Sequence, residues 1–317
     1  MTVSLDIDSV LAARERIAPY VQVTPVLTSR VLDDATGATL FFKCENFQRV
    51  GAFKARGAHN AVFALSDAEA AHGVVTHSSG NHGAALALAA RTRGIPAWVI
   101  VPEGALASKV AAIRRYGATI VSCAPTLAAR ESAAARVKAE TGARMVHPYN
   151  DPWVIAGQGT AALELLDQAP DLDAVITPVG GGGLLSGTAL AVKGRDPSIA
   201  VYGAEPAGAD DAARSMAAGE LIPQTAPNTI ADGLRSSLGD LTWPIIRREV
   251  SAILTVSEPQ ILAAMRELWE VLKIVVEPSS AVAYAALKAN PEIFKGLRAG
   301  LVLTGGNVDL DALPRFG

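Results

Sequence analysis

The sequence predicts an α/β fold with two lobes, each built on an open, mainly parallel, twisted sheet flanked by helices. The first reason is that apolar strand-like runs alternate with amphipathic helix-like runs, the pattern of parallel sheets covered by helices. The second is that this alternation occurs in two sets, with a change near residue 148. The third is length, since 317 residues exceed the roughly 150 residues of an average domain.

The expected elements begin with a helix at residues 7–18, for which Asp6 is the N-cap and Pro19 lies near the end. The rest of the first set comprises strands 40–44, 73–77, 97–101, 119–123 and 145–147, with helices 54–65, 83–93, 108–116 and 126–140. The second set comprises strands 173–179, 200–205, 252–256 and 300–304, with helices 152–168, 184–193, 258–271 and 278–289. Residues 206–235 are rich in Gly, Ala, Asp and Pro, so we expect them to be irregular.

The composition is typical of a globular enzyme. Hydrophobic residues make up 50% of the chain, charged residues 19%, and the net charge is −3. Without a basic patch or charged tail, nucleic acid and anionic membranes are not expected partners. No apolar run approaches the ~18 residues of a membrane span, and the N-terminus has no signal-peptide pattern. Cys44 and Cys123 form no CxxC motif, which fits a reducing cytoplasm.

Four consecutive glycines, Gly180, Gly181, Gly182 and Gly183, join an expected strand to an expected helix in PVGGGGLLSG. Such a turn presents main-chain N–H groups to an anion, and the helix dipole adds to the attraction. Neither a Walker A motif nor a strict GxGxxG is present, although Glu205 lies at the spacing of the acid in a dinucleotide site. The residues alone leave three interpretations open: a dinucleotide, another phosphate ligand, or a tight turn.

Four further segments contain residue types that carry chemistry. Lys54, in GAFKARGAH, is either a solvated helix lysine or an amine of lowered pKa that attacks a carbonyl. SSGNHG (78–83) either offers hydroxyls and amides to an anion or caps the next helix through Ser79 or Asn81. EPAGADD (205–211) is either a solvated turn or an oxygen-ligand site for a cation. TGGN (304–307) places a hydroxyl at a strand end, where α/β sheets bind ligands.

Together these segments resemble the signatures of the fold type II pyridoxal-phosphate enzymes. FKARGA, SSGNHG, GGGGLLSG and TGGNVDL match in order, and HPYNDPWVIAGQGT and TIADGLRSS fit as well. Within that group the chain is most similar to the serine racemase and serine/threonine dehydratase branch, over nearly its full length. The resemblance implies a large cofactor-binding domain of residues 1–52 and 148–317, a small domain of residues 53–147, and a homodimer.

The resemblance assigns a cofactor site to these motifs. Lys54 is expected to bind pyridoxal phosphate covalently beside Phe53, and glycines 180–183 are expected to hold its phosphate. Other expected contacts with the ring are Asn81 at the phenolic oxygen, Thr304 at the pyridine nitrogen, and Glu277 nearby in a role that stays open.

The resemblance also assigns the groups that act on substrate. Lys54 and Ser79 are expected to exchange protons on opposite faces of the substrate α-carbon. The substrate carboxylate is expected to be bound by Ser78, Ser79, Asn81 and His82. Arg130 lies where this branch can carry an arginine in the substrate pocket, which suits a second carboxylate. The alternative for Arg130 is a solvated helix arginine.

A divalent-cation site is implied at Glu205, the Ala209 carbonyl and Asp211. These are hard oxygen ligands, which Mg²⁺, Ca²⁺ and Mn²⁺ all accept. The resemblance therefore favours a cation over the solvated turn.

The expected reaction is α,β-elimination of a β-hydroxy amino acid, such as L-serine, L-threonine or 3-hydroxyaspartate, to a 2-oxo acid and ammonia. Return of a proton from Ser79 gives racemisation instead, so a serine or hydroxy-amino-acid racemase is the alternative. A β-replacement enzyme of the same fold is disfavoured, because that branch shows Thr-Gly-Asn where this chain has Gly-Asn-His. A nicotinamide-dependent oxidoreductase and a non-catalytic interaction protein are also disfavoured, because neither gives Lys54 a chemical role.

Overall fold

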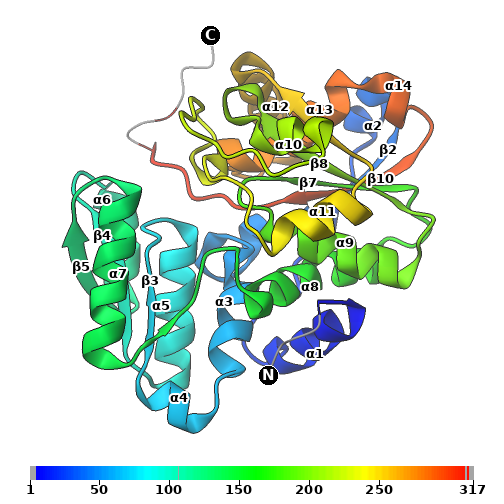
Figure 1. The fold of residues 1–317 in the computed structure, drawn as a ribbon. Helices are drawn as coiled ribbons and strands as arrows, with labels where there is room; N and C mark the ends of the chain where they lie inside the picture. Colours follow the sequence, from blue (N-terminus) through cyan, green and yellow to red (C-terminus); the bar gives the residue numbers. More distant parts are fainter. Residues whose placement is uncertain (1–4, 106, 311–312, 314–317) are drawn as a thin grey trace.

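Two separate sheets form the framework of the computed structural model, which describes residues 5–105, 107–310 and 313 (Figure 1). Within this part of the chain one sheet has six strands and the other has four. All strand pairs are parallel except one pair at the edge of the larger sheet. The predicted two-lobed α/β fold with mainly parallel sheets is therefore confirmed.

The larger sheet is built from segments that lie far apart in the sequence. The chain runs along its edge early, leaves to form the smaller sheet, and returns with the central strands. Its strands, in spatial order, are β1 (Val26–Leu27), β2 (Thr39–Cys44), β10 (Arg298–Leu303), β7 (Ala174–Pro178), β8 (Ala200–Pro206) and β9 (Ala252–Val256). The antiparallel pair is β1 with β2.

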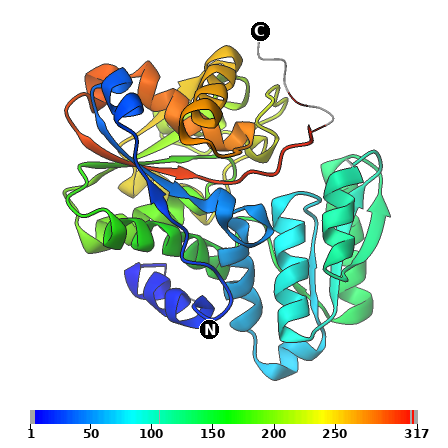
Figure 2. The same cartoon turned by 180° about the vertical axis from the view of Figure 1, so that it is seen from behind.

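Helices cover both faces of the larger sheet, because successive side chains of a strand point to opposite faces. Ile176 of β7 joins the apolar cluster of one face, whereas its neighbour Val175 joins the cluster of the other face. Figures 1 and 2 show the two helical layers on either side of the sheet. One layer contains α12 (Glu258–Leu272), α13 (Pro278–Ala289), α2 (Arg30–Thr36) and α14 (Pro291–Phe294), and the other contains α1 (Ile7–Ile17), α8 (Pro152–Gln168), α9 (Gly183–Arg195) and α11 (Thr242–Glu249).

The smaller sheet is also covered on both faces. Its strands, in spatial order, are β5 (Thr119–Cys123), β4 (Ala97–Pro102), β3 (Val74–Thr76) and β6 (Arg144–Met145). One face packs against α3 (Lys54–Phe63), α5 (Asn81–Arg93) and α6 (Ala107–Arg115), and the other against α7 (Leu127–Thr141). The short helix α4 (Asp67–Ala71) joins α3 to β3. We propose 53–147 as the boundaries of this domain.

The structure corrects the prediction that residues 206–235 are irregular. They contain α10 (Asp211–Ala218), and the Glu205 carboxylate accepts hydrogen bonds from the main-chain N–H groups of Ala212 at 3.0 Å and Ala213 at 3.1 Å. A carboxylate at a helix N-terminus stabilises that helix. This partner lies on β8, seven residues before Ala212.

In the part of the chain that the structure describes, no helix combines the length and the apolar character that crossing a membrane requires.

The capping prediction for α1 is confirmed, since the Asp6 side chain accepts a hydrogen bond from the Ser9 main-chain N–H at 3.0 Å. Residues 1–4, part of the N-terminal segment in which no signal peptide is expected, lie outside the described residues.

Candidate active site

Lys54 is the first residue of α3, and it lies beside the carboxyl end of β10. The main-chain N–H of Phe53 donates to the carbonyl oxygen of Thr304 at 3.0 Å, and Ala52 forms an isolated bridge with Gly305. These contacts hold the start of α3 against the residues that follow β10. Two of the motifs quoted from the sequence are therefore neighbours in space.

Lys54 is half-buried, and among the described residues its amine has one hydrogen-bond partner. Its Nζ donates to the carbonyl oxygen of Pro148 at 2.8 Å and lies 5.0 Å from the centre of the Phe53 ring. Burial lowers the pKa of Lys54 to about 8, while the negative charge of Glu277 acts in the opposite direction. A larger share of such an amine is unprotonated at neutral pH, and this form attacks carbonyls and accepts protons.

The glycine run forms the turn between β7 and the N-terminus of α9. Gly182 is the N-cap of α9 with φ +88°, in the left-handed region that favours glycine. A Cβ atom on Gly180 would lie 3.0 Å from the Cα of Leu234, so a larger residue would force the neighbouring backbone to shift. No described residue accepts a hydrogen bond from the main-chain amides of residues 181–183. Unused amides at a helix N-terminus fit a phosphate group.

Two adjacent residues bring the lysine and the glycine turn to one region. Pro148 accepts the hydrogen bond from Lys54. The ring of Tyr149 covers Gly181, since a Cβ atom there would lie 2.2 Å from the tyrosine Cγ. The dipeptide Pro148–Tyr149, which precedes α8, therefore contacts both the amine of Lys54 and the glycine turn.

Asn81 is the first residue of α5, and its side chain faces the loops of the larger sheet. Its Nδ2 donates to Glu277 Oε1 at 2.9 Å, and its Oδ1 accepts from Asn307 Nδ2 at 2.9 Å. The N-cap of α5 is Gly80, which offers no side chain. The alternative in which Ser79 or Asn81 caps this helix is therefore wrong, because the Asn81 amide is used across the site.

Glu277 precedes α13 and is 5% exposed. Burial raises the pKa of Glu277 to about 7, and the negative charge of Asp232 adds to the increase. A carboxyl group that titrates near neutrality can both hold and release a proton during a reaction. Its bond to Asn81 links it to the loop 78–83.

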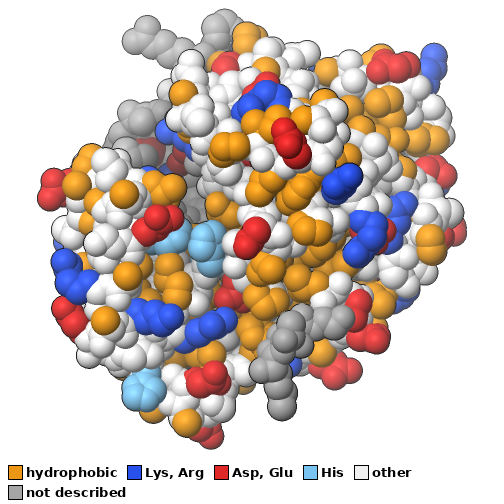
Figure 3. Space-filling view, in the orientation of Figure 1, with side chains coloured by type: hydrophobic (Ala, Val, Ile, Leu, Met, Phe, Trp, Pro, Cys, Tyr) orange, Lys and Arg blue, Asp and Glu red, His pale blue; other side chains and the backbone are white. Residues whose placement is uncertain are grey.

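Histidines border the lysine on the small-domain side. The Nε2 of His82 lies 3.3 Å from the carbonyl oxygen of Val146, and its Nδ1 is buried with no partner among the described residues. Burial lowers the pKa of His82 well below its usual value and that of His147 to about 4. The rings of His77 and His147 are 5.0 Å apart, and Figure 3 shows histidine side chains gathered where the lobes meet. Burial therefore favours the neutral form of these imidazoles.

Arg130 lies on α7, and Ser78 and Ser79 are half-buried in the loop that follows β3. The pKa of His77, the residue before Ser78, is lowered by burial and also by the charge of Arg130. The Nε of Arg130 is buried, and no described residue accepts a hydrogen bond from it. A guanidinium with an unused donor suits a carboxylate.

The predicted cation ligands lie at the end of β8. Glu205 is 1% and Asp211 2% exposed, and Ala209 is buried in the turn between them. Burial raises the pKa of Glu205 to about 9, and the charge of Asp211 adds to the increase. No group of three or more His, Cys, Asp or Glu side chains in the described residues could hold a metal ion, so a carbonyl such as that of Ala209 would have to contribute.

A cavity of about 660 Å³ adjoins the site, and Asn81 and Glu277 form part of its wall. An ion pair between Lys109 of α6 and Asp232, both of which line this cavity, connects the two lobes. Lys54 is not among the residues that line this cavity.

Sequence reasoning missed four participants: Pro148, Tyr149, Asn307 and His147. Each lies inside a motif that the sequence analysis quoted, HPYND or TGGNVDL, so its position was visible. Their contacts could not be predicted, because Pro148, Tyr149 and Asn307 contact residues that are far apart from them in the sequence. The partners are Lys54, Gly181 and Asn81, respectively.

These groups fit pyridoxal phosphate: an amine of lowered pKa for its aldehyde, unused amides for its phosphate, and Thr304 at the same sheet edge. The fold and the site thus define an enzyme of the fold type II pyridoxal-phosphate class. The chain belongs to the family described as pyridoxal-phosphate dependent enzymes, whose sequence model matches residues 17–305.

Named relatives narrow the class. The chain is 55% identical over 307 residues to a beta-hydroxyaspartate dehydratase of Paracoccus denitrificans (strain Pd 1222), a match that covers 97% of this chain and 98% of that protein. It is 52% identical over 313 residues to a serine racemase of Oryza sativa subsp. indica, covering 97% and 92%. The structure of maize serine racemase superposes with a TM-score of 0.95 at 50% identity, covering 98% and 95%.

Proposed function

We propose that this chain eliminates water from a β-hydroxy amino acid and releases a 2-oxo acid and ammonia. The observation that carries the proposal is the amine of Lys54, whose pKa is lowered to about 8 beside the glycine turn and the loop 78–83. The relatives named dehydratase and racemase support it. An amine such as that of Lys54 can both bind an aldehyde and accept a proton.

When bound, pyridoxal phosphate supplies a conjugated ring that withdraws electrons from the α-carbon of an attached amino acid. Glycines 180–183 bind its phosphate and Asn81 orients its ring, with Phe53, Glu277 and Thr304 around it. The free amine of Lys54 then takes the α-proton. The β-hydroxyl leaves as water, and a water molecule later releases ammonia, so the overall change is loss of ammonia from the substrate.

Ser79 serves the opposite face of the α-carbon in this proposal, while Ser78, Asn81 and His82 hold the substrate carboxylate. A proton delivered from the Ser79 hydroxyl to that face inverts the centre. Racemisation is therefore the second candidate function, and the serine racemases among the relatives favour it. Both reactions begin with the same proton transfer to Lys54.

We propose 3-hydroxyaspartate as the preferred substrate. The unused Nε of Arg130 supplies a charged donor for a second carboxylate, which serine and threonine lack. The Paracoccus relative is named for this compound.

A panel assay tests the proposal. The purified enzyme is given L-serine, L-threonine and the 3-hydroxyaspartate isomers, and oxo-acid formation and change of chirality are both measured. We expect oxo acid from at least one substrate, with the highest kcat/KM for a 3-hydroxyaspartate. Arg130→Met should lower kcat/KM for that substrate about 100-fold and for serine by less than about threefold. Absence of both products from every substrate would refute the elimination chemistry.

The rate is expected to rise with pH. Burial lowers the pKa of Lys54 from 10.5 to about 8, and only the unprotonated amine accepts the α-proton. At a pH well below this pKa most of the amine is protonated, so kcat at pH 6 should be about 100-fold lower than above pH 9. Saturating assays across this range measure the profile. A flat profile between pH 6 and 9 would show that Lys54 is not the base.

We also propose a divalent cation bound by Glu205, the Ala209 carbonyl and Asp211. Two buried carboxylates repel each other, so one of them holds a proton unless a cation offsets their charge. We expect EDTA to lower the Tm of the wild-type protein by about 2–6 °C and Mg²⁺ or Ca²⁺ to restore it. Glu205→Gln should remove this response. If neither EDTA nor added Mg²⁺ or Ca²⁺ changed the Tm of the wild-type protein, a cation at this site would be excluded.

From the family resemblance we propose that the protein is a homodimer. Sedimentation of the purified protein tests this oligomeric state.

Cys44 and Cys123 are both free thiols. On that basis we propose that the protein resides in a reducing compartment, the cytoplasm.

A further inference from the structure

Helix α8 lies between the helix that carries the lysine and the helix that begins at the glycine turn. A Cβ atom on Gly157 of α8 would lie 2.6 Å from the Cα of Gly57 in α3. A Cβ atom on Gly159 of α8 would lie 2.5 Å from the carbonyl oxygen of Gly187 in α9. The backbones of three helices therefore touch in series. This contact sets the spacing between Lys54 and the phosphate-binding turn.

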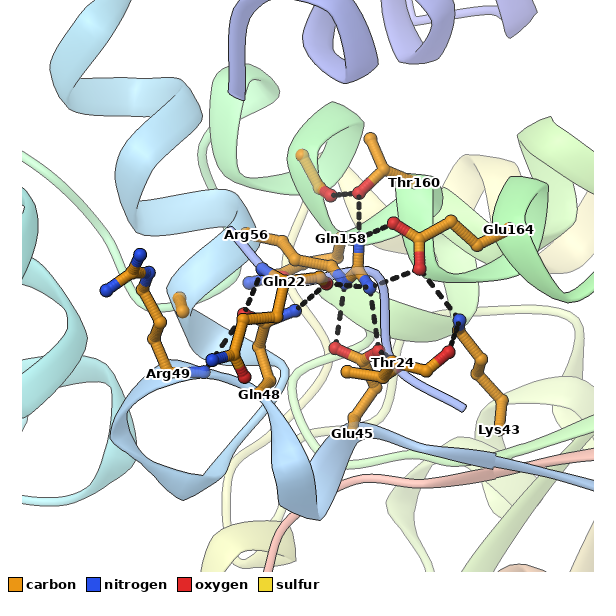
Figure 4. Close-up of polar contacts among 12 residues, drawn as sticks. Gln22, Thr24, Lys43, Glu45, Gln48, Arg49, Arg56, Gln158, Thr160 and Glu164 are labelled. Carbon is orange, nitrogen blue, oxygen red and sulfur yellow. Dashed lines mark hydrogen bonds and ion pairs between the residues drawn. The ribbon is translucent and has the colours of Figure 1, made fainter. Parts of the chain in front are cut away.

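Arg56, two residues after Lys54 in α3, is completely buried and clasps two carboxylates (Figure 4). Its Nε and Nη2 donate to Glu45 at 2.7 and 2.8 Å, and its Nη1 and Nη2 donate to Glu164 at 2.7 and 2.8 Å. Nη1 also donates to Thr160 Oγ1 at 3.3 Å. Glu45 follows β2, whereas Glu164 and Thr160 belong to α8. The planar guanidinium therefore fixes α3 to two other elements at once.

A second buried cation balances the charge of this cluster. The Nζ of Lys43 donates to Glu164 Oε2 at 2.7 Å, to the Thr24 carbonyl oxygen at 2.7 Å and to Gln168 Oε1 at 2.8 Å. The two cations and the two carboxylates then sum to zero. Lys43 lies on β2 and makes none of these bonds to α3, so removing it changes the charge of the cluster without releasing the lysine helix.

We propose that Arg56 is a positioning residue for the reaction: its double clasp of Glu45 and Glu164 locks the start of α3, and with it Lys54, against α8 and the glycine turn. Arg56 is too deeply buried to meet a substrate, so it acts through Lys54. A lysine at position 56 would keep the charge and lose the two-sided geometry. The inference rests on the proposed function, because it assumes that Lys54 is the reacting amine.

The test compares Arg56→Lys with Lys43→Met as its matched control, in the full-length enzyme. Each variant disturbs the same buried cluster, but only the first loosens α3. The rate of covalent loading of Lys54 is measured by adding pyridoxal phosphate, trapping with borohydride and mapping peptides. For Arg56→Lys we expect this rate and kcat to fall about 10- to 100-fold with KM changed less than about threefold. For Lys43→Met we expect both within about twofold of wild type, although its Tm falls.

Three results would overturn the inference: equal losses in the two variants, no loss in Arg56→Lys, or a loss confined to KM. If Arg56→Lys does not fold, the double variant Arg56→Met with Glu45→Gln replaces it, since Lys43 and Glu164 keep that cluster neutral. Normal loading of the double variant would also refute the clasp. Failure of the wild-type enzyme to load Lys54 is a different outcome, because it removes the proposed function together with this inference.

Discussion

Replacing Lys54 with alanine is expected to abolish both elimination and racemisation. The substitution removes the amine that holds the cofactor and the base that takes the α-proton, so kcat should fall by about 10⁴-fold or more. Oxo-acid formation and change of chirality are measured on the same samples. Both activities must disappear together, because the proposal gives them one shared first step.

The control for this variant is Lys138→Ala, which removes an exposed lysine of α7 and should leave both activities unchanged. Thermal unfolding of the Lys54→Ala protein should resemble that of the wild-type enzyme without added cofactor, because within the described part of the chain the Lys54 side chain makes a single hydrogen bond, to Pro148. Retention of either activity by Lys54→Ala would contradict the lysine chemistry.

Replacing Ser79 with alanine is expected to separate the two reactions. Racemisation needs a proton donor on the face opposite Lys54, so loss of the hydroxyl should lower it about 100-fold or more. Elimination from an L-substrate depends on the amine of Lys54 and should fall less than about tenfold. Chiral analysis of recovered serine, together with an assay of pyruvate, measures both rates in one reaction.

Ser79→Thr keeps a hydroxyl at the same position and serves as the control for that experiment. We expect it to retain more racemisation than Ser79→Ala. If the alanine variant lost both activities in equal proportion, Ser79 would have no face-specific role, and its contribution would be confined to binding the substrate carboxylate.

Much of the fold could be predicted because its signals are local. The helix at 152–168 and the strand at 252–256 have the predicted bounds, since apolar periodicity and a proline at the first turn depend only on neighbouring residues. Helix α10 was not predicted, because residues 206–235 are rich in Gly, Ala, Asp and Pro, a composition typical of irregular segments. The short strand β1 depends on pairing with β2.

The site divides in the same way. Lys54, Asn81 and the glycine run could be predicted as candidates because each belongs to a sequence motif that resembles a family signature. Arg56 could not, although it follows Lys54 by two residues, because an arginine in a helix is usually solvated. Its partners are distant, and the Lys43–Glu164 pair in the same cluster is separated by 121 positions. The role of such charged residues can be recognised only in the folded structure, where they are buried next to one another.

The bond between Lys54 and pyridoxal phosphate is the central claim, and peptide mapping after borohydride reduction tests it most directly. Borohydride turns a bond between an amine and an aldehyde into a stable secondary amine, so the modified peptide can be identified by mass. We predict a single modified peptide, the one that contains residues 53–58, with the added mass on Lys54. An unmodified Lys54 in freshly purified, fully loaded enzyme, or modification of another lysine instead, would contradict the account.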